Sequence, residues 1–517
     1  MKRLLLGLCL ASGVYGCEAA DNNDAQGTDP AAGSWKPETN LLTDTETLEP
    51  TKDPLSTADS RSPLVPADRQ AMIDDGFGNW KDADGEAPLL YSIDDEEQPA
   101  RGKNARRLAR FAHLADLQLA DDESPGRAVN LDQAGPLGGA FRPQESDLCR
   151  MINAMVKTLN NVNTKTPLSF VLLGGDNADN AQQNEVDWTL QILGGQDKVE
   201  CDSGDDDDLV PGPDNDGKDP FAAPGLDVPF YWVTGNHDVE AQGTAAITTP
   251  LYQEAVVGTK PLPGYKLRDF SQPGGPASDG PVPADPNRKF LERKELMQRV
   301  QEHGDGHGLS TEQVDSGKAI YTFDVANSPL RFLVIDTAAE TGGAEGVIHQ
   351  ADVDAYIKPA LDKAADDGKW VIVTSHHASR ALSDGSGFFG KKQDDALTKQ
   401  AWIDLLGGYP NVIFALAAHD HADHVEQQNP TSGQAYWELT TSALADYPHQ
   451  ARIIELWDED NGYVSLQAIY VDLDMDDEAV AEAGRHLGVM DYVSGWNTFF
   501  ALGKTSKRNA ILYMKKP

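Results

Sequence analysis

The stretch VPFYWVTGNHD, residues 228–238, begins as an apolar run and ends in an amide, an imidazole and a carboxylate. Such a run is typical of a buried strand, and open α/β sheets place their functional sites in the polar loops after strand ends. Asn236 and His237 therefore stand at the edge of a predicted sheet. Of the motifs in this chain, TGNHD (residues 234–238) is the most specific indicator of a site.

An apolar run followed by acids, amides or histidines recurs four more times. The other motifs are HLADLQ at 113–118, GGDNADN at 174–180, TSHH at 374–377 and AAHDH at 417–421. Each has an ordinary structural explanation when taken alone, because an Asp after a strand is often a helix cap and a histidine pair is often structural. Five such motifs in one order predict strands that bring their ends to one shared site.

These strand ends are rich in oxygen and imidazole ligands, which suits two neighbouring divalent metals. The predicted ligands are Asp116, Asp176, Asn236, His376, His419 and His421. A carboxylate is the natural bridge between two ions, and Asp176 is the best candidate because the glycines before it allow a tight turn. Asp116 and His421 would bind one ion, and the remaining amide and imidazoles would bind the other.

His237 adjoins a predicted ligand, so it would lie near the metals without binding them. A protonated imidazole there would donate a proton to the leaving oxygen, and Asp179, three residues after Asp176, would orient the ring and keep it protonated. Coordinated water has a lowered pKa, so a metal-bridging hydroxide would be the nucleophile. The predicted reaction is hydrolysis of a phosphomonoester or a phosphodiester, with a small phosphoester as the substrate.

With these motifs in this order, the chain resembles the calcineurin-like metallophosphoesterase superfamily over residues 108–470. The resemblance implies a four-layer α/β/β/α sandwich of two mixed sheets flanked by helices, with two divalent ions (Mn, Fe, Zn or Ca) at one edge. It implies the following site residues: Asp116, Asp176 and His421 for the first metal, Asp176, Asn236, His376 and His419 for the second, His237 as general acid and Asp179 as its partner. More narrowly, the chain is similar to a bacterial exported group with Asp-x-Gln in the first motif.

Two positions depart from the superfamily pattern. Gln118 stands where a histidine ligand is usual, and a neutral amide is a poorer ligand, so the first metal would bind weakly or take water instead. Asn180 replaces the arginine of Ser/Thr protein phosphatases, which argues against that activity. The alternative function is therefore an exported binding or structural lipoprotein on the same fold with impaired catalysis. Six intact ligand positions favour the enzyme.

Four further histidines are candidates for a place near the site. His377 and His424 lie close to the ligand motifs in the sequence, where they would either contact the substrate phosphate or serve a structural role. His303 and His307 belong to the Gly-rich segment HGDGHG and would line a pocket without binding metal.

The N-terminus has the pattern of an exported lipoprotein. Residues 1–17 combine Lys2 and Arg3, an apolar core and a lipobox-like VYGC that ends at Cys17. The predicted outcome is lipidation of Cys17 and anchoring to a membrane of the cell envelope, facing the periplasm or the outside. A plain cleaved signal peptide or an uncleaved anchor is the alternative. No later apolar run is long enough to span a bilayer.

Composition predicts a disordered, acidic and Pro-rich tether at 18–67, followed by one metallophosphoesterase domain at 68–517 with insertions near 196–224 and 242–317. The formal net charge of −40 disfavours nucleic acid as a partner. Cys149 and Cys201 form an even pair, which is either a disulfide or two free thiols. The sequence leaves the oligomeric state open.

The pattern of apolar residues also predicts most of the helices and strands. Helices are expected at 148–159, 181–193, 290–301 and 352–365. Strands are expected at 108–112, 170–173, 228–233, 319–324, 330–335, 370–373, 412–417, 435–439, 451–456 and 463–470. Strands interleaved with helices, then strands crowding toward the end, suggest two packed sheets.

Overall fold

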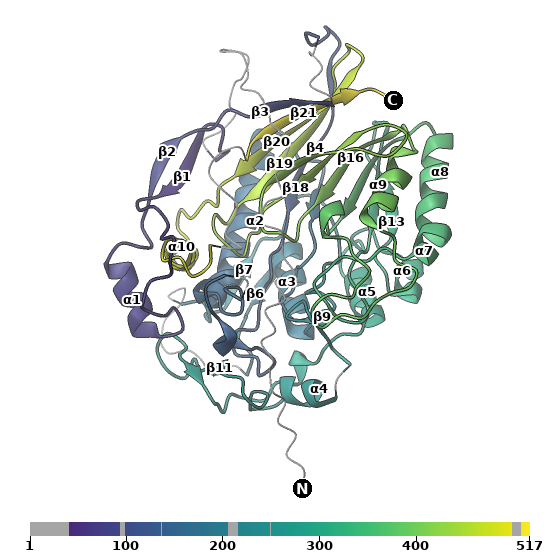
Figure 1. Cartoon of the computed structure of the whole chain (residues 1–517). Coiled ribbons are helices and arrows are strands. Elements are labelled where there is room, and N and C mark those ends of the chain that lie inside the picture. The colour runs from purple at the N-terminus through teal and green to yellow at the C-terminus, as the bar shows by residue number, and fades with distance from the viewer. Residues whose placement is uncertain (1–40, 94–98, 136, 205–215, 249, 499–507) are drawn as a thin grey trace.

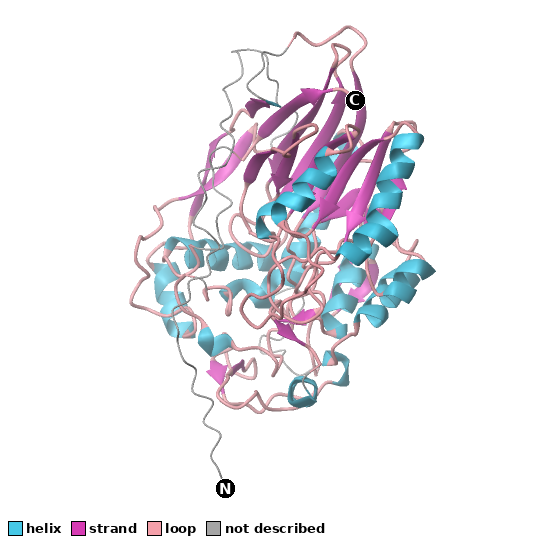
Figure 2. Ribbon diagram, turned by 45° about the vertical axis from the view of Figure 1, so that its right-hand side comes forward, coloured by secondary structure: helices cyan, strands magenta, loops and turns pink. Residues whose placement is uncertain are grey.

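A computed structural model describes residues 41–93, 99–135, 137–204, 216–248, 250–498 and 508–517. The predicted signal peptide and Cys17 lie outside these residues. Two mixed sheets form the centre of the molecule, with helices against their outer faces (Figures 1 and 2). Among the described residues, no helix is both long and apolar enough to cross a bilayer.

The first sheet has seven strands in the order β3-β21-β20-β19-β4-β5-β8. Their bounds are Leu89–Ser92 for β3, Ala510–Lys515 for β21, Tyr463–Val471 for β20, Ala451–Asp458 for β19, Arg106–Leu114 for β4, Val171–Leu173 for β5 and Phe230–Tyr231 for β8. The strands β4, β5 and β8 are parallel, so their carboxyl ends meet at one edge of this sheet.

The second sheet has six strands in the order β13-β14-β15-β16-β18-β17. Their bounds are Tyr321–Asp324 for β13, Leu330–Ile335 for β14, Trp370–Ser375 for β15, Val412–Ala417 for β16, Tyr436–Thr440 for β18 and His424–Gln428 for β17. The four strands β14, β15, β16 and β18 run parallel. Their carboxyl ends also share one edge.

Alternation along β14 shows why this sheet is buried on both faces. Phe332 points into the core between the sheets, where its ring centroid lies 5.3 Å from that of Phe111 on β4 and 5.4 Å from that of Phe170. Its neighbour Leu333 points the other way, into a second core under the outer helices. A strand with two buried faces reads as a continuous apolar run, which is the pattern that predicted it.

Helices complete the layers of the sandwich. The ten α-helices of the described residues are α1 Pro66–Asp74, α2 Leu148–Lys165, α3 Gln183–Gly194, α4 Pro250–Val256, α5 Arg293–Glu302, α6 Thr311–Ser316, α7 Gln350–Asp352, α8 Lys358–Asp366, α9 Lys399–Gly407 and α10 Ala479–Val493. Buried residues of α2 and α3 join the core of the first sheet, and those of α8 and α9 join the second core. The predicted α/β/β/α sandwich is thereby confirmed.

Four short two-stranded ribbons extend from the sandwich. They are β1 Glu46–Pro50 with β2 Trp80–Asp84, β6 Gln196–Val199 with β7 Phe221–Ala223, β9 Glu240–Ala241 with β10 Ala245–Ala246, and β11 Leu267–Arg268 with β12 Ala277–Ser278. The pair β6 and β7 lies at the ends of the predicted insertion at 196–224. Cys149 in α2 and Cys201, just after β6, are joined by a disulfide.

Part of the predicted disordered tether at 18–67 has regular structure, while residues 18–40 lie outside the described residues. Residues 41–67 lie among the described residues, where β1 pairs with β2 along five residues and α1 begins at Pro66. Leu42 is 3% exposed and packs into the main core, and Thr47 donates to Asp472 at 3.2 Å. Composition misled here because backbone pairing and one anchored apolar side chain order a polar segment that has little core of its own.

Most predicted elements are present within a few residues of their expected bounds, but some were missed. The helix expected at 148–159 continues to Lys165, and the one expected at 352–365 contains a π-helical turn at Val353–Ile357. The sequence patterns did not indicate β3, β21, α9 or α10. The excursion at 242–317, expected to hold one clear helix, contains α4, α5 and α6.

Candidate metal centre

All six predicted ligands follow carboxyl ends of parallel strands. In the first sheet, Asp116, Asp176 and Asn236 come after β4, β5 and β8. In the second sheet, His376 follows β15, and His419 and His421 follow β16. The two sheets present these ends on the same side of the sandwich. Side chains that are up to 305 positions apart in the sequence therefore meet, as the distances below show.

The carboxylates and imidazoles form one buried cluster. His376 Nε2 lies 3.0 Å from Asp176 Oδ2 and 4.0 Å from Asp116 Oδ1. His421 Nε2 lies 3.5 Å from Asp116 Oδ1, and His419 Nδ1 lies 3.3 Å from His376 Nε2. The ligand atoms of Asp116, Asp176 and His376 all lie within 4.8 Å of one another, a spacing at which they could hold a metal ion.

Hydrogen bonds fix which atoms of the ligands face the cluster. His376 donates from Nδ1 to the carbonyl oxygen of Gly174 at 2.8 Å, which leaves Nε2 as a lone-pair donor to a cation. His421 donates from Nδ1 to Asp446 Oδ2 at 2.6 Å with the same effect. Carboxylates and carbonyl groups behind a ligating histidine orient the ring and increase its basicity.

Asn236 supplies an independent test of whether a metal fits this place. Its Nδ2 donates to the carbonyl oxygen of Gly243 at 2.8 Å, so its amide orientation is set. Its Oδ1 is fully buried and has no hydrogen-bond partner in the described part of the chain. A buried amide oxygen without a donor is costly, and a bound cation would satisfy it. The donor set therefore fits divalent metals.

The backbone at the cluster is unusual in a way that also points to a site. Asp116, Gln118, Asp176, His419 and His421 all have φ between 39° and 71°, in the left-handed region. Residues with a Cβ pay a steric cost there, and such strain tends to gather at functional sites. A Cβ built on Gly235 would lie 2.1 Å from Asp176 Oδ1, so that neighbouring position has to be glycine.

Mutual electrostatics hold the cluster charged. Burial lowers the pKa of His376, but the charge of Asp176 outweighs burial and raises it to about 9. Burial likewise disfavours the imidazolium of His421, yet Asp116 and Asp446 raise its pKa to about 10. Conversely, the charges of His376 and His237 overcome burial and lower the pKa of Asp176 well below its usual range. A metal that binds here would displace these protons.

His237 lies beside the cluster, as predicted, and contacts Asp176 through its backbone. Its N–H donates to Asp176 Oδ1 at 2.8 Å. The ring Nδ1 lies 2.8 Å from the carbonyl oxygen of Asp179 and 3.3 Å from its Oδ1, so Nδ1 carries a proton. Burial lowers the pKa of His237, but the charges of Asp176 and Asp179 raise it above its ordinary value.

The carboxylate of Asp179 has a second set of partners that the sequence did not reveal. Arg127, fully buried, donates to Asp179 Oδ2, and Arg142 Nη1 lies 3.5 Å from Asp179 Oδ1. Glu145 accepts from Arg127 at 2.5 Å and completes the group. We call these four buried residues (Arg127, Arg142, Glu145 and Asp179) the arginine cluster. Its two arginines hold the carboxylate of Asp179 in place next to His237.

Gln118, which stands where a histidine ligand is usual, contacts Arg142. Its Oε1 accepts from Arg142 Nη2 at 2.6 Å. Because a guanidinium can only donate, the amide oxygen has to face Arg142, and the positive charge there opposes binding of a cation to the same oxygen. The same guanidinium donates from Nε to Asp446 Oδ1 at 3.0 Å, so it reaches His421 through Asp446. Gln118 as a weak ligand of the first metal stays a prediction, and the contact with Arg142 argues against it.

Asp446 and Asp238 are functional residues that the sequence reasoning missed. Asp446 sits in a loop 25 residues after His421, and neither spacing nor composition marks it as a partner. Asp238, the last residue of TGNHD, accepts from the backbone of Asn177, Ala178 and Gly235, and thereby ties the second motif to the third. Its position directly after His237 was the only available signal.

The four additional histidines lie in three different places. His377 is buried next to His376, Thr337 contacts its Nδ1 at 2.8 Å and Ala344 accepts from its Nε2 at 3.1 Å. The ligand atoms of His376, His377 and His419 lie within 4.8 Å of one another, so these three form a second group that could hold a metal. His424 opens β17. His303 and His307 contact each other at 2.9 Å, and His307 stacks on Phe230, so neither belongs to the groups that could hold a metal.

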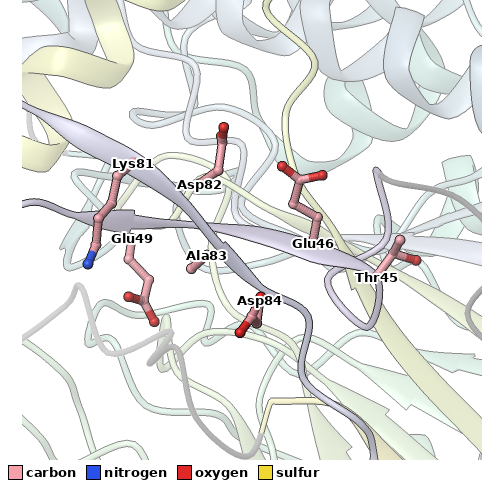
Figure 3. A pocket seen from close by; sticks show the side chains of 7 residues that line it. All are labelled: Thr45, Glu46, Glu49, Lys81, Asp82, Ala83 and Asp84. Carbon is pink, nitrogen blue, oxygen red and sulfur yellow. The ribbon is translucent and has the colours of Figure 1, made fainter.

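A surface depression on the β1–β2 ribbon is separate from this centre (Figure 3). Its lining residues are Thr45, Glu46, Glu49, Lys81, Asp82, Ala83 and Asp84. None of them is a predicted ligand, and the acidic side chains are solvated on a ribbon that projects from the sandwich (Figure 1).

The sandwich and its buried carboxylate, amide and imidazole cluster define a metallophosphoesterase. A family model described as calcineurin-like phosphoesterase matches residues 109–423, and the chain belongs to that family. The match spans every predicted ligand from Asp116 to His421. It also confirms the resemblance inferred from the motifs.

Comparison with solved structures finds proteins of low sequence identity to this chain. The chain is similar to a dimetal phosphatase from Danio rerio, at 12% identity and a TM-score of 0.38 over 71% of this chain and 100% of that one. It is also similar to a purple acid phosphatase from yellow lupin, at 12% identity and a TM-score of 0.27 over 75% and 55%. The chain is also similar to the anchor in the inner membrane complex of Plasmodium, at 13% identity and a TM-score of 0.26, over 73% of this chain and 95% of that one. No curated protein matches the chain.

Proposed function

We propose that this protein hydrolyses a small phosphomonoester or phosphodiester with two divalent metal ions, which would be Mn, Fe, Zn or Ca. The observation that carries the proposal is the buried Oδ1 of Asn236, which has no hydrogen-bond partner among the described residues. It lies in the motif that also holds His237 and adjoins the cluster of Asp116, Asp176 and His376.

The ligands divide into two sets that share one carboxylate. Asp116, Asp176 and His421 would hold the first ion, and Asp176, Asn236, His376 and His419 would hold the second. Two ions bound there would activate a water molecule near neutral pH and offset the charge of the phosphoryl oxygens. The chain itself positions these ligands through Gly174 and Asp446, which accept from His376 and His421.

His237 acts as the general acid in this proposal. Its Nδ1 donates to the backbone carbonyl of Asp179. The proton that can be transferred to a leaving oxygen is therefore the one on Nε2. Burial opposes the charged ring, but Asp176 and Asp179 raise the pKa of His237 above its ordinary value, which favours the protonated form. The arginine cluster immobilises Asp179 and so positions the ring without touching the substrate.

We also propose that the protein is exported and attached to a membrane of the cell envelope by a lipid on Cys17, facing the periplasm or the outside. The support is the lipobox-like VYGC at 14–17 after a short apolar core. A formal net charge of −40 opposes binding to nucleic acid, so a small phosphoester is the proposed substrate.

A second candidate function is an exported binding or structural lipoprotein whose catalysis is impaired. One observation favours it: Arg142 places a positive charge 2.6 Å from Gln118 Oε1, next to the first metal position. If that charge excludes the first ion, only the second set of ligands remains complete. The two candidates differ in the number of metal ions that the purified protein holds.

The decisive experiment measures metal content and turnover on the same sample. Bound metal per chain is determined, and hydrolysis of p-nitrophenyl phosphate and bis-p-nitrophenyl phosphate is followed with added manganese. Two ions with clear turnover support the enzyme, and the ratio of the two rates separates a monoesterase from a diesterase. One ion or none, without turnover after reconstitution, supports the binding protein.

The matched variants are Asp176→Asn and Asp366→Asn. We expect Asp176→Asn to lose metal and to abolish metal-dependent turnover while the fold remains, because the amide cannot bridge two cations. Asp366 is an exposed acid at the end of α8, and its variant controls for the loss of one negative charge. Full activity of Asp176→Asn would contradict the dinuclear proposal.

A further inference from the structure

Two adjacent aromatic side chains are the most exposed large apolar groups among the described residues. Phe388 is 77% exposed and Phe389 is 62% exposed, and their ring centroids lie 4.1 Å apart. Leaving two rings in water forgoes the hydrophobic stabilisation that burial would give. Contiguous exposed apolar groups of this kind often mark binding sites.

The loop that carries these rings is held in a defined shape. Gly390 donates to the carbonyl oxygen of Gly387 at 2.9 Å, and Gln393 donates to that of Asp384 at 2.6 Å. Phe389 itself has φ 61°, a left-handed conformation that costs a residue with a large side chain about 1 kcal/mol. The surrounding contacts therefore impose this conformation and present both rings to solvent.

Short backbone contacts connect this loop to the metal centre. The ligand Asn236 donates to Gly243, and the next residue, Thr244, accepts from the backbone N–H of Gly343 at 2.9 Å. A Cβ built on Gly342 would lie 2.5 Å from the carbonyl oxygen of Phe389 and 3.3 Å from that of Thr244, so these backbones touch. The backbone of Gly342 thus lies between that of Phe389 and that of Thr244, which follows the residue that accepts from Asn236.

Two basic residues come soon after the rings, and two acids, Asp394 and Asp395, come after those. Lys391 and Lys392 are exposed, in a chain whose formal net charge is −40. A phosphoester is anionic at its phosphate and often apolar in its organic part. Two exposed lysines next to two exposed aromatic rings complement such a molecule at both ends.

We propose that Phe388 and Phe389 form a subsite that binds the aromatic or apolar organic group of the substrate. This inference rests on the proposed function, because it needs the phosphate to sit at the metal centre. It narrows the substrate class to phosphoesters with an apolar organic group. The rings contact that group and take no part in the chemical step.

The test compares two phosphonates that cannot be hydrolysed, methylphosphonate and benzylphosphonate. Their dissociation constants are measured by calorimetry on the manganese-loaded protein and on the double variant Phe388→Ser/Phe389→Ser. Wild type is expected to bind benzylphosphonate about tenfold more tightly than methylphosphonate, the value of an aromatic contact. In the double variant the two constants become nearly equal, and the constant for methylphosphonate does not change.

Controls separate this effect from misfolding and from the proposed function itself. Both rings are exposed, so their removal leaves no cavity, and a thermal unfolding curve checks the fold. Val65→Ser changes another exposed apolar residue, before α1, and should keep the wild-type preference. Phe388→Leu/Phe389→Leu should keep part of the preference, since the leucines remain apolar.

Three outcomes would overturn the inference. Equal binding of the two phosphonates to wild type, or an unchanged preference in the double variant, contradicts the subsite while manganese binding and turnover leave the proposed function intact. The rings would be assigned to a lipid surface if two results came together. The two phosphonates would bind with equal affinity, and wild type, but not the double variant, would sediment with phosphatidylglycerol–phosphatidylcholine vesicles. Failure of both phosphonates to bind, together with absence of turnover, would instead reject the proposed function.

Discussion

At the scale of single residues, Asn236 connects sequence, structure and chemistry most directly. One end of its amide is fixed by Gly243, so the other end has to present a bare oxygen inside the protein. Nothing in the side chain's type requires this, because most buried Asn residues find donors for their oxygen. The missing donor makes Asn236 a ligand candidate rather than a structural residue.

His237→Ala tests the proposed general acid. The backbone N–H of residue 237 still donates to Asp176, so we expect both metals to remain bound. Loss of proton donation should slow cleavage of an alkyl phosphate about a hundredfold or more, and that of p-nitrophenyl phosphate much less. Rates for both substrates and metal per chain are measured, with His307→Ala as the control. Equal slowing of both substrates would exclude the assigned role.

Removal of metal should proceed in two unequal steps. Arg142 lies next to the first metal position and holds Gln118, so we expect the ion of that set to leave first. Stepwise chelation with metal analysis at each stage measures the two affinities. His421→Ala should abolish the release step of the weakly bound first ion, and His419→Ala should abolish that of the tightly bound second ion. A single step that releases both ions would show that the arginine does not bias the centre.

At the scale of elements, the disulfide links α2 to the segment after β6. The residues it joins are 52 apart, so the loop-entropy relation assigns it about 4 kcal/mol of the free energy of unfolding. We expect Cys149→Ser/Cys201→Ser to lose about this amount in chemical denaturation. Neither element contributes a ligand, so metal content should not change. In reducing buffer, the free energy of unfolding of wild type should equal that of the variant. If it instead equals that of untreated wild type, the disulfide contributes little to stability.

The loops after the strands act as one unit because Asp238 and the glycines tie them together. Asp238 bonds to the loop of GGDNADN and to its own loop, while the Gly235 backbone passes too close to Asp176 for any side chain. The metal centre is therefore preorganised by hydrogen bonds between loops, and a small error in one loop would move ligands from both sheets.

At the scale of the whole molecule, buried acids make stability depend on pH. Burial, followed by repulsion from Glu145, raises the pKa of Asp132 to about 8. An unfolded aspartate ionises near pH 4, so the folded state keeps a proton that the unfolded state releases. The contribution of Asp132 to stability is therefore full below about pH 4 and is lost as the pH rises to about 8.

Asp132→Asn should remove this dependence. Between pH 5 and 8, wild type is expected to lose stability relative to the variant by up to about 1.4 kcal/mol per pH unit. Denaturation curves at several pH values and constant metal concentration measure the difference. Asp59→Asn is the opposite control, because its hydrogen bond to Arg61 lowers the pKa of Asp59. Parallel curves for wild type and Asp132→Asn would contradict the assigned pKa.

Local sequence determined the strands of this protein and marked its candidate ligand residues. Apolar runs such as 330–335 and 412–417 can be satisfied only by burial on both faces, and the acids and histidines after them need a shared partner. The family and the sandwich could therefore be read from the chain, and the six predicted ligands come together at one edge of it. Cys149 and Cys201 could be read only as a candidate pair, since spacing does not distinguish a bond from two thiols.

Only the tertiary structure decided which side chains meet across the fold. Arg142 reaches Gln118 and Asp446, which lie 24 positions before it and 304 after it, and thereby links the first motif to the partner of His421. Residues 41–67 became ordered through β2 and the main core, against their polar composition. The proposed subsite at Phe388 and Phe389 rests on backbone contacts through Gly342 to Thr244, which are distant in the sequence. A sequence pattern records what each segment can bury, whereas contacts between distant segments depend on how the packed layers bring them together.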